Sequence, residues 1–128
     1  MIRSLKGDLR LKSSIAPDGN RTSSINGATV DLRGYGSALA IVHAAAITDG
    51  THTPKLQESS DDSSWSDVAA ADLDGSFVAL ETNLVQHVAY KGTKRYIRLV
   101  VTVTGSPGTG GKFSAGVLVS HPGHFPIA

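Results

Sequence analysis

Residues 37–68, which decide the fold, read SALAIVHAAAITDGTHTPKLQESSDDSSWSDV. Within them Leu39, Ile41 and Ile47 alternate with small apolar residues, so both faces of an extended chain are apolar here. This pattern is typical of a strand in the middle of a sheet, and we expect neither of its faces to meet water. Turn residues at 48–50 and 59–64 each precede a new run, so the stretch predicts three successive strands.

Shorter runs with period-two alternation occur on both sides of this stretch. They predict further strands at 28–33, 76–81, 85–90, 94–104 and 112–120. One face of the run 94–104 is wholly apolar, with Ile97, Leu99, Val101 and Val103. About eight short antiparallel strands at such spacing predict an all-β domain, a β-sandwich, and a jelly roll is one topology that fits.

Composition divides the chain into three parts. Residues 1–26 are polar, and we expect an N-terminal arm that a partner orders, with an edge strand over 9–15 as the alternative. Residues 27–120 should form the sandwich. Residues 121–128 contain two prolines and predict an extended C-terminal tail, because proline cannot continue a central strand.

The chain of 128 residues contains no cysteine, which excludes disulfides, thiolate metal sites and thiol nucleophiles. We find no apolar run of membrane-spanning length and no signal-peptide pattern, and we expect folding in a cytoplasm. The net charge of +1 hides a segregation along the chain. Residues 49–90 are strongly acidic and residues 91–128 carry only basic charges, so charged patches could attract sister copies or another partner.

Few residues point to catalysis or to ligand binding. The glycine-rich loop TGSPGTGGKF (104–113) departs from the phosphate-binding pattern at Ser106 and Phe113, and we expect a hairpin loop instead. The acidic residues between 61 and 74 lack the spacing of a calcium loop, and we favour a solvated turn. His43 and His87 are expected in the core or an interface. We therefore predict no catalytic residue, no metal, no cofactor and no enzyme activity.

Basic and aromatic side chains alternate between residues 90 and 98, as they do in proteins that bind single-stranded nucleic acid. Aromatic residues are only 5% of the chain, however, and the net charge is close to zero. We therefore favour a protein partner over nucleic acid.

Residues 47–68, ITDGTHTPKLQESSDDSSWSDV, resemble small structural proteins encoded in the head-gene clusters of tailed phages and prophages. The likeness continues in VDLRGYG (30–36), YKGTKRYIR (90–98) and HPGH (121–124). The resemblance implies a virion protein that decorates or cements the capsid surface. Its partners would be the major capsid protein and sister copies, and not nucleic acid or a membrane. Such a protein would be made in the cytoplasm of the bacterial host.

We expect the interface to include charged residues and the C-terminal tail. The candidates are Arg3, Lys6, Arg10, Lys12, Asp61, Asp62, Lys91, Lys94, Arg95, His121, His124 and Phe125. Two alternatives remain open, a head-tail connector or tail component and a carbohydrate-binding module. The second is considered because the element SDDSSW also resembles hairpins of galactose-binding-like sandwiches, although we expect Trp65 to lie in the core.

Overall fold

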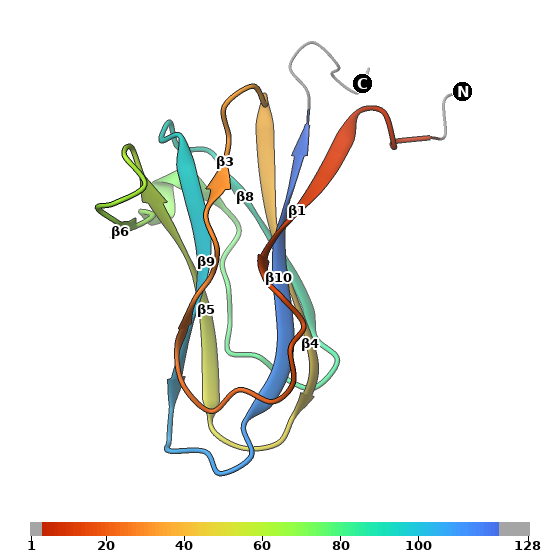
Figure 1. Cartoon of the computed structure of the whole chain (residues 1–128), viewed down its shortest axis with the longest axis vertical. Coiled ribbons are helices and arrows are strands. Elements are labelled where there is room, and N and C mark those ends of the chain that lie inside the picture. Colours follow the sequence, from red (N-terminus) through yellow and green to blue (C-terminus); the bar gives the residue numbers. More distant parts are fainter. Residues whose placement is uncertain (1–3, 121–128) are drawn as a thin grey trace.

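The computed structural model describes residues 4–120, which form two five-stranded antiparallel sheets packed together (Figure 1). Sheet A has the order β1 (Leu9–Ile15), β10 (Gly111–Ser120), β4 (Ser37–Ile47), β8 (Val85–Tyr90) and β7 (Leu73–Asp74). Sheet B has the order β2 (Ile25–Asn26), β9 (Tyr96–Thr104), β5 (Thr51–Ser59) and β6 (Ser66–Asp67), and β3 (Val30–Asp31) also pairs with β9. The expected all-β sandwich is confirmed, whereas the jelly-roll topology is not.

The only helical element of the described residues is a 3-10 turn at Ala70–Asp72. Nothing in residues 4–120 forms a helix long and apolar enough to cross a membrane.

The expected strand over 76–81 is wrong. This segment bridges the two sheets instead, because its backbone groups bond to both of them. The side-chain amide of Gln86 on β8 pairs with the N–H and C=O of Val78 at 2.8 and 2.9 Å. The N–H of Leu80 donates to the carbonyl of His52 on β5 at 2.7 Å. The bridge closes one side of the sandwich.

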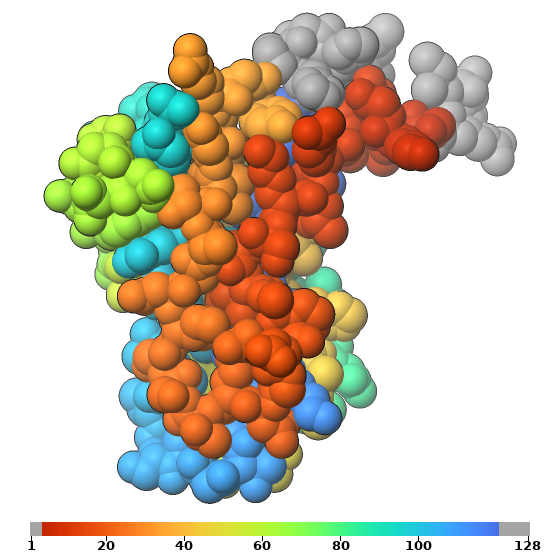
Figure 2. Space-filling view, in the orientation of Figure 1, coloured from red at the N-terminus to blue at the C-terminus, as the bar shows by residue number. Residues whose placement is uncertain are grey.

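The other side is closed by residues that we expected to form an N-terminal arm. Residues 9–15 and 25–26 are instead strands of the sandwich, so the boundary expected at residue 26 is wrong and the edge-strand alternative holds for 9–15. Buried Ser14 on β1 joins the sheets, since its hydroxyl donates to Ala28 O at 2.8 Å and accepts from Leu99 N at 3.1 Å. Figure 2 shows this part of the chain, from red to orange, lying along the near side of the molecule.

The core lies between the sheets, and β4 is the central strand of sheet A, as expected. Its small residues point into the core, where Ala40 and Ala44 are fully buried. Larger core side chains come from β9 and β10, among them Leu99 and Phe113. The bulky Leu39 and Ile41 of β4 lie on the opposite face and are only half-buried. The expectation that neither face of this strand meets water is therefore wrong for the described chain.

The glycine-rich loop joins β9 of sheet B to β10 of sheet A. The hairpin loop expected here is therefore wrong, because the two strands pair with other strands and the loop crosses between the sheets. A carboxylate of the same chain binds to this loop. The Asp49 carboxylate accepts hydrogen bonds from the backbone N–H groups of Gly108, Thr109 and Gly110, at 2.9, 3.2 and 2.5 Å. These bonds, with that of Gly110 the strongest, hold the pKa of Asp49 below its usual value. The loop therefore serves to fix the turn at residues 48–50.

Candidate interaction site

The described interface candidates gather at or near one end of the sandwich (Figure 1). β1 begins there and β10 ends there, since Leu9 pairs with Ser120. β5 ends and β9 begins at the same end, since Ser59 pairs with Tyr96. The candidates located there are Lys6, Arg10, Lys12, Asp61, Asp62, Lys91, Lys94 and Arg95. The other four candidates, Arg3, His121, His124 and Phe125, lie outside the described residues.

A cleft of about 510 Å³ opens at this end, between the turn that follows β3 and the loop that joins β8 to β9. Basic side chains and tyrosines line it together, namely Arg33, Lys94, Arg95, Tyr35 and Tyr90. Lys12 of β1 reaches the same place, because its ammonium lies 4.8 Å from the centre of the Tyr35 ring. The cleft thus combines cationic groups with flat apolar surface.

The Tyr90 hydroxyl fixes the loop on one side of the cleft. It donates a hydrogen bond to Glu58 Oε1 at 2.7 Å and accepts one from the backbone N–H of Lys94 at 3.1 Å. Burial first, and then the bond to Glu58, raise the pKa of this hydroxyl above its usual value. Tyr90 therefore stays protonated and keeps donating at any pH at which the protein would be used.

The cations of the cleft differ in how far they are neutralised. Arg95 forms a bidentate ion pair with Asp31, at 2.9 Å for both hydrogen bonds. The hydrogen bonds from Arg95 are the main reason why the pKa of Asp31 is lowered to about 2. Within residues 4–120, by contrast, the charged groups of Arg33 and Lys94 have no acidic partner at salt-bridge distance. These two exposed cations remain available to an external anion.

The acidic loop beside β6 is organised by its own side chains. The Asp61 carboxylate accepts the backbone N–H groups of Ser63 and Ser64, each at 2.9 Å, which lowers its pKa. Asp62 accepts a hydrogen bond from the Thr29 hydroxyl at 2.6 Å. The expected self-bonded turn is confirmed, and residues 4–120 hold no cluster of three potential metal-ligating side chains.

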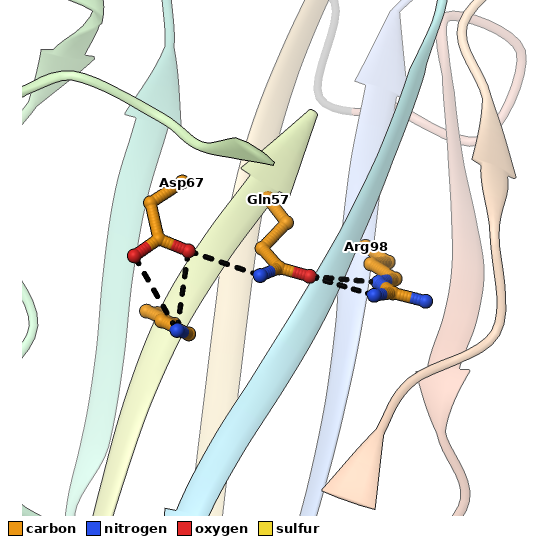
Figure 3. A network of polar contacts seen from close by, with 4 residues as sticks. Gln57, Asp67 and Arg98 are labelled. Carbon is orange, nitrogen blue, oxygen red and sulfur yellow. Dashed lines mark hydrogen bonds and ion pairs between the residues drawn. The ribbon is translucent and has the colours of Figure 1, made fainter. Parts of the chain in front are cut away.

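The acidic and basic blocks of the sequence meet on the outer face of sheet B, where Gln57 links Asp67 to Arg98. Arg95 from the basic block pairs with Asp31, and Lys55 pairs with Asp67 at 3.1 Å within the acidic block. On the outer face of sheet B, Asp67 also accepts from Gln57 at 3.0 Å (Figure 3). The Gln57 oxygen in turn accepts two N–H groups of Arg98, at 3.0 and 2.8 Å. The network crosses β6, β5 and β9 and makes this face polar.

Trp65 lies at the surface beside this network, so the expectation that it belongs to the core is wrong. Its side chain is only half-buried, and the Arg98 guanidinium lies 4.3 Å from the centre of its ring. A cation over the ring is a stable arrangement at a surface. It also covers a ring face on which a sugar would otherwise stack.

A core position for His43 and His87 is wrong, and an interface position for them stays a prediction. His43 and His87 are exposed on the outer face of sheet A, whereas His52 is fully buried. His52 Nε2 lies 3.0 Å from the Asp49 carbonyl oxygen, and its ring meets the Phe113 ring edge-on. His52, Pro54 and Leu56 occupy alternate positions of β5, and all three are buried. This period of two was the sequence signal that places His52 inside.

Comparison of the chain with protein-family models, with curated proteins and with solved structures gives no match. The case for a function therefore rests on the residues and on the arrangement of the cleft.

A variant without the Tyr90 hydroxyl tests whether this group fixes the loop on one side of the cleft. We expect Tyr90→Phe to lower the free energy of unfolding by about 1.5–3 kcal/mol, because Glu58 and the Lys94 N–H lose their partner. Urea denaturation would measure the loss. Tyr96→Phe is the matched control, because the ring of Tyr96 is half-buried on the outer face of sheet B. Equal losses in the two variants would contradict the assigned role.

Proposed function

We propose that this protein is a structural virion component that decorates or stabilises the capsid of a tailed phage through protein-protein contacts. The observation that carries the proposal is the gathering of the described interface candidates at or near one end of the sandwich, where Lys94 and Arg95 line a cleft. A decoration protein needs a rigid body and a contact surface at one end. The sandwich supplies the first and the loops around the cleft supply the second. The resemblance in sequence supports the same function.

The cleft is suited to an acidic, extended segment of the major capsid protein. Arg33 and Lys94 provide two cations that have no acidic partner at salt-bridge distance among residues 4–120, and Tyr35 provides apolar surface between them and β1. Contacts between exposed charges speed association and weaken in salt. Capsid binding through this cleft is therefore expected to be salt-sensitive.

Cosedimentation with capsids that lack the protein tests the proposal. We expect saturable binding at a fixed ratio to the major capsid protein, and binding that weakens between low and high salt. Lys94→Glu and Arg33→Glu should each weaken binding roughly tenfold, which corresponds to about 1.4 kcal/mol. Lys112→Glu is the matched control, since it makes the same charge change in a residue at the opposite end of the sandwich.

Two results would contradict this proposal. Absence of binding at any salt concentration would reject capsid decoration and direct attention to the head-tail connector, the tail or a glycan. Binding that Lys94→Glu and Lys112→Glu weaken equally would reject the cleft as the docking site while leaving a decoration function in place.

A further inference from the structure

The outer face of sheet A carries a row of apolar side chains that nothing in residues 4–120 covers. The register places Leu11 beside Leu118, Leu118 beside Leu39, and Leu39 beside Ala89. Leu118 and Leu39 are half-buried and Leu11 is 65% exposed. An antiparallel sheet with one face in water ordinarily has polar side chains on that face. A row of three leucines and an alanine across four strands is the kind of exposed patch that marks an interface.

Among the residues that the structure describes, none with a charged side chain lies in the middle of this face. The next row, again set by the register, contains Ser13, Gly116, Ile41 and His87. Arg10 and Lys12 of β1 project from the other side of the strand, because they pair with the inward-facing Val119 and Val117. Asp74, beside Ala89, lies only at the β7 edge. A neutral apolar face does not attract nucleic acid or anionic lipid and favours a protein surface of the same kind.

The face has a ridge and a hollow side by side. Leu11 and Leu118 form the ridge, and the row below them on the same two strands contains the small residues Ser13 and Gly116. A hollow of about 340 Å³ lies there, with Ile41 on its wall. Two residues along a strand separate the rows by roughly 7 Å. The ridge and the hollow therefore lie one row apart on one surface.

We propose that this face binds the same face of a second copy, around a two-fold axis that runs between the two rows and parallel to them. This axis places Leu118 of each copy over Gly116 of the other, and Leu11 over Ser13. Both halves of the contact are equivalent, as an isologous interface requires. The sheets would pack about 10 Å apart, as in ordinary sheet-on-sheet packing.

The size of the face is sufficient for such a pair. Four strands about 4.8 Å apart and four rows about 7 Å apart cover on the order of 500 Å² per copy. Two copies would bury about 1,000 Å², which is the lower limit of specific interfaces. We therefore expect a reversible dimer rather than an obligate one. The dimer does not depend on capsid binding, because the face and the cleft are different surfaces.

Light scattering coupled to size exclusion, over a range of protein concentrations, tests the dimer. We expect the wild-type protein to approach twice its chain mass of 13.3 kDa as the concentration rises. Leu118→Glu should weaken the dimer at least a hundredfold, because it buries a carboxylate beside its own symmetry mate. Val78→Glu is the matched control, since Val78 is 58% exposed on the bridge between the sheets, away from this face.

A mixing experiment separates a specific interface from a loss of folding. Leu118→Glu and Leu118→Lys should each be monomeric alone, and an equimolar mixture should recover a heterodimer. A wild-type protein that stays monomeric at every concentration would overturn the proposal, and deletion of 121–128 would then show whether that segment covers the face. A dimer that Leu118→Glu leaves intact would overturn it as well.

Discussion

Replacing Gly110 by alanine will lower the free energy of unfolding by about 2–5 kcal/mol, the sum of backbone strain and a steric clash. Gly110 has a φ of 81°, in the left-handed region that residues with a Cβ avoid. A Cβ there would also overlap the carbonyl oxygen of Arg21 and lie 2.6 Å from its carbon. That carbonyl is bonded to Gly111 N at 3.1 Å, so it cannot move without breaking the contact between residue 21 and β10.

The control for this variant is Gly19→Ala. Gly19 has a similar positive φ of 57°, but a Cβ at Gly19 would have no atom within 4 Å. We expect it to cost only the backbone strain, about 1–2 kcal/mol. Urea denaturation of both variants gives the comparison. If Gly110→Ala costs no more than Gly19→Ala, then the close packing of the loop against Arg21 is not a source of stability.

Truncation of Leu99 to alanine will lower the free energy of unfolding by about 2–5 kcal/mol, the range found for buried leucines. Leu99 is 0% exposed and belongs to the core between the sheets. Its backbone N–H also donates to the Ser14 hydroxyl of β1, and its carbonyl accepts from Gly27 N at 2.7 Å. A cavity here would therefore disturb the place where the N-terminal strands join sheet B.

Leu5→Ala is the matched control, because it removes the same atoms from a leucine that is 60% exposed. Its effect on the free energy of unfolding should stay within about 0.5 kcal/mol. Thermal unfolding monitored by circular dichroism would rank the two variants. Similar melting temperatures would mean that the space around Leu99 collapses after truncation or that the leucine is not part of a rigid core.

The two proposed surfaces depend on different interactions, so an experiment can contradict one proposal without contradicting the other. The cleft relies on the cations Arg33 and Lys94, so salt should weaken its contacts. The outer face of sheet A relies on apolar area around Leu118, so salt should leave its contacts largely unchanged. A protein that dimerises but does not bind capsids would retain the second surface and lose the first.

The sequence by itself determined the fold class and the longest strands. Alternation with a period of two is a local property, and in residues 85–90 and 112–120 it located strands almost to the residue. The apolar pattern of residues 37–47 also placed β4 at the centre of a sheet. The self-bonded acidic turn followed from Asp61 and its neighbouring serines, because those bonds span only two or three residues.

Only the tertiary structure decided which groups meet across long stretches of chain. Three contacts join residues that are 33 to 64 positions apart. They are the pairing of Asp31 with Arg95, the hydrogen bonds of Asp49 to the glycine-rich loop, and the contact of Arg98 with Trp65. It also decided that Leu39 and Leu118 share an uncovered face. Local patterns specify which side of a strand is apolar, but sheet pairing and the packing of layers determine what covers that side.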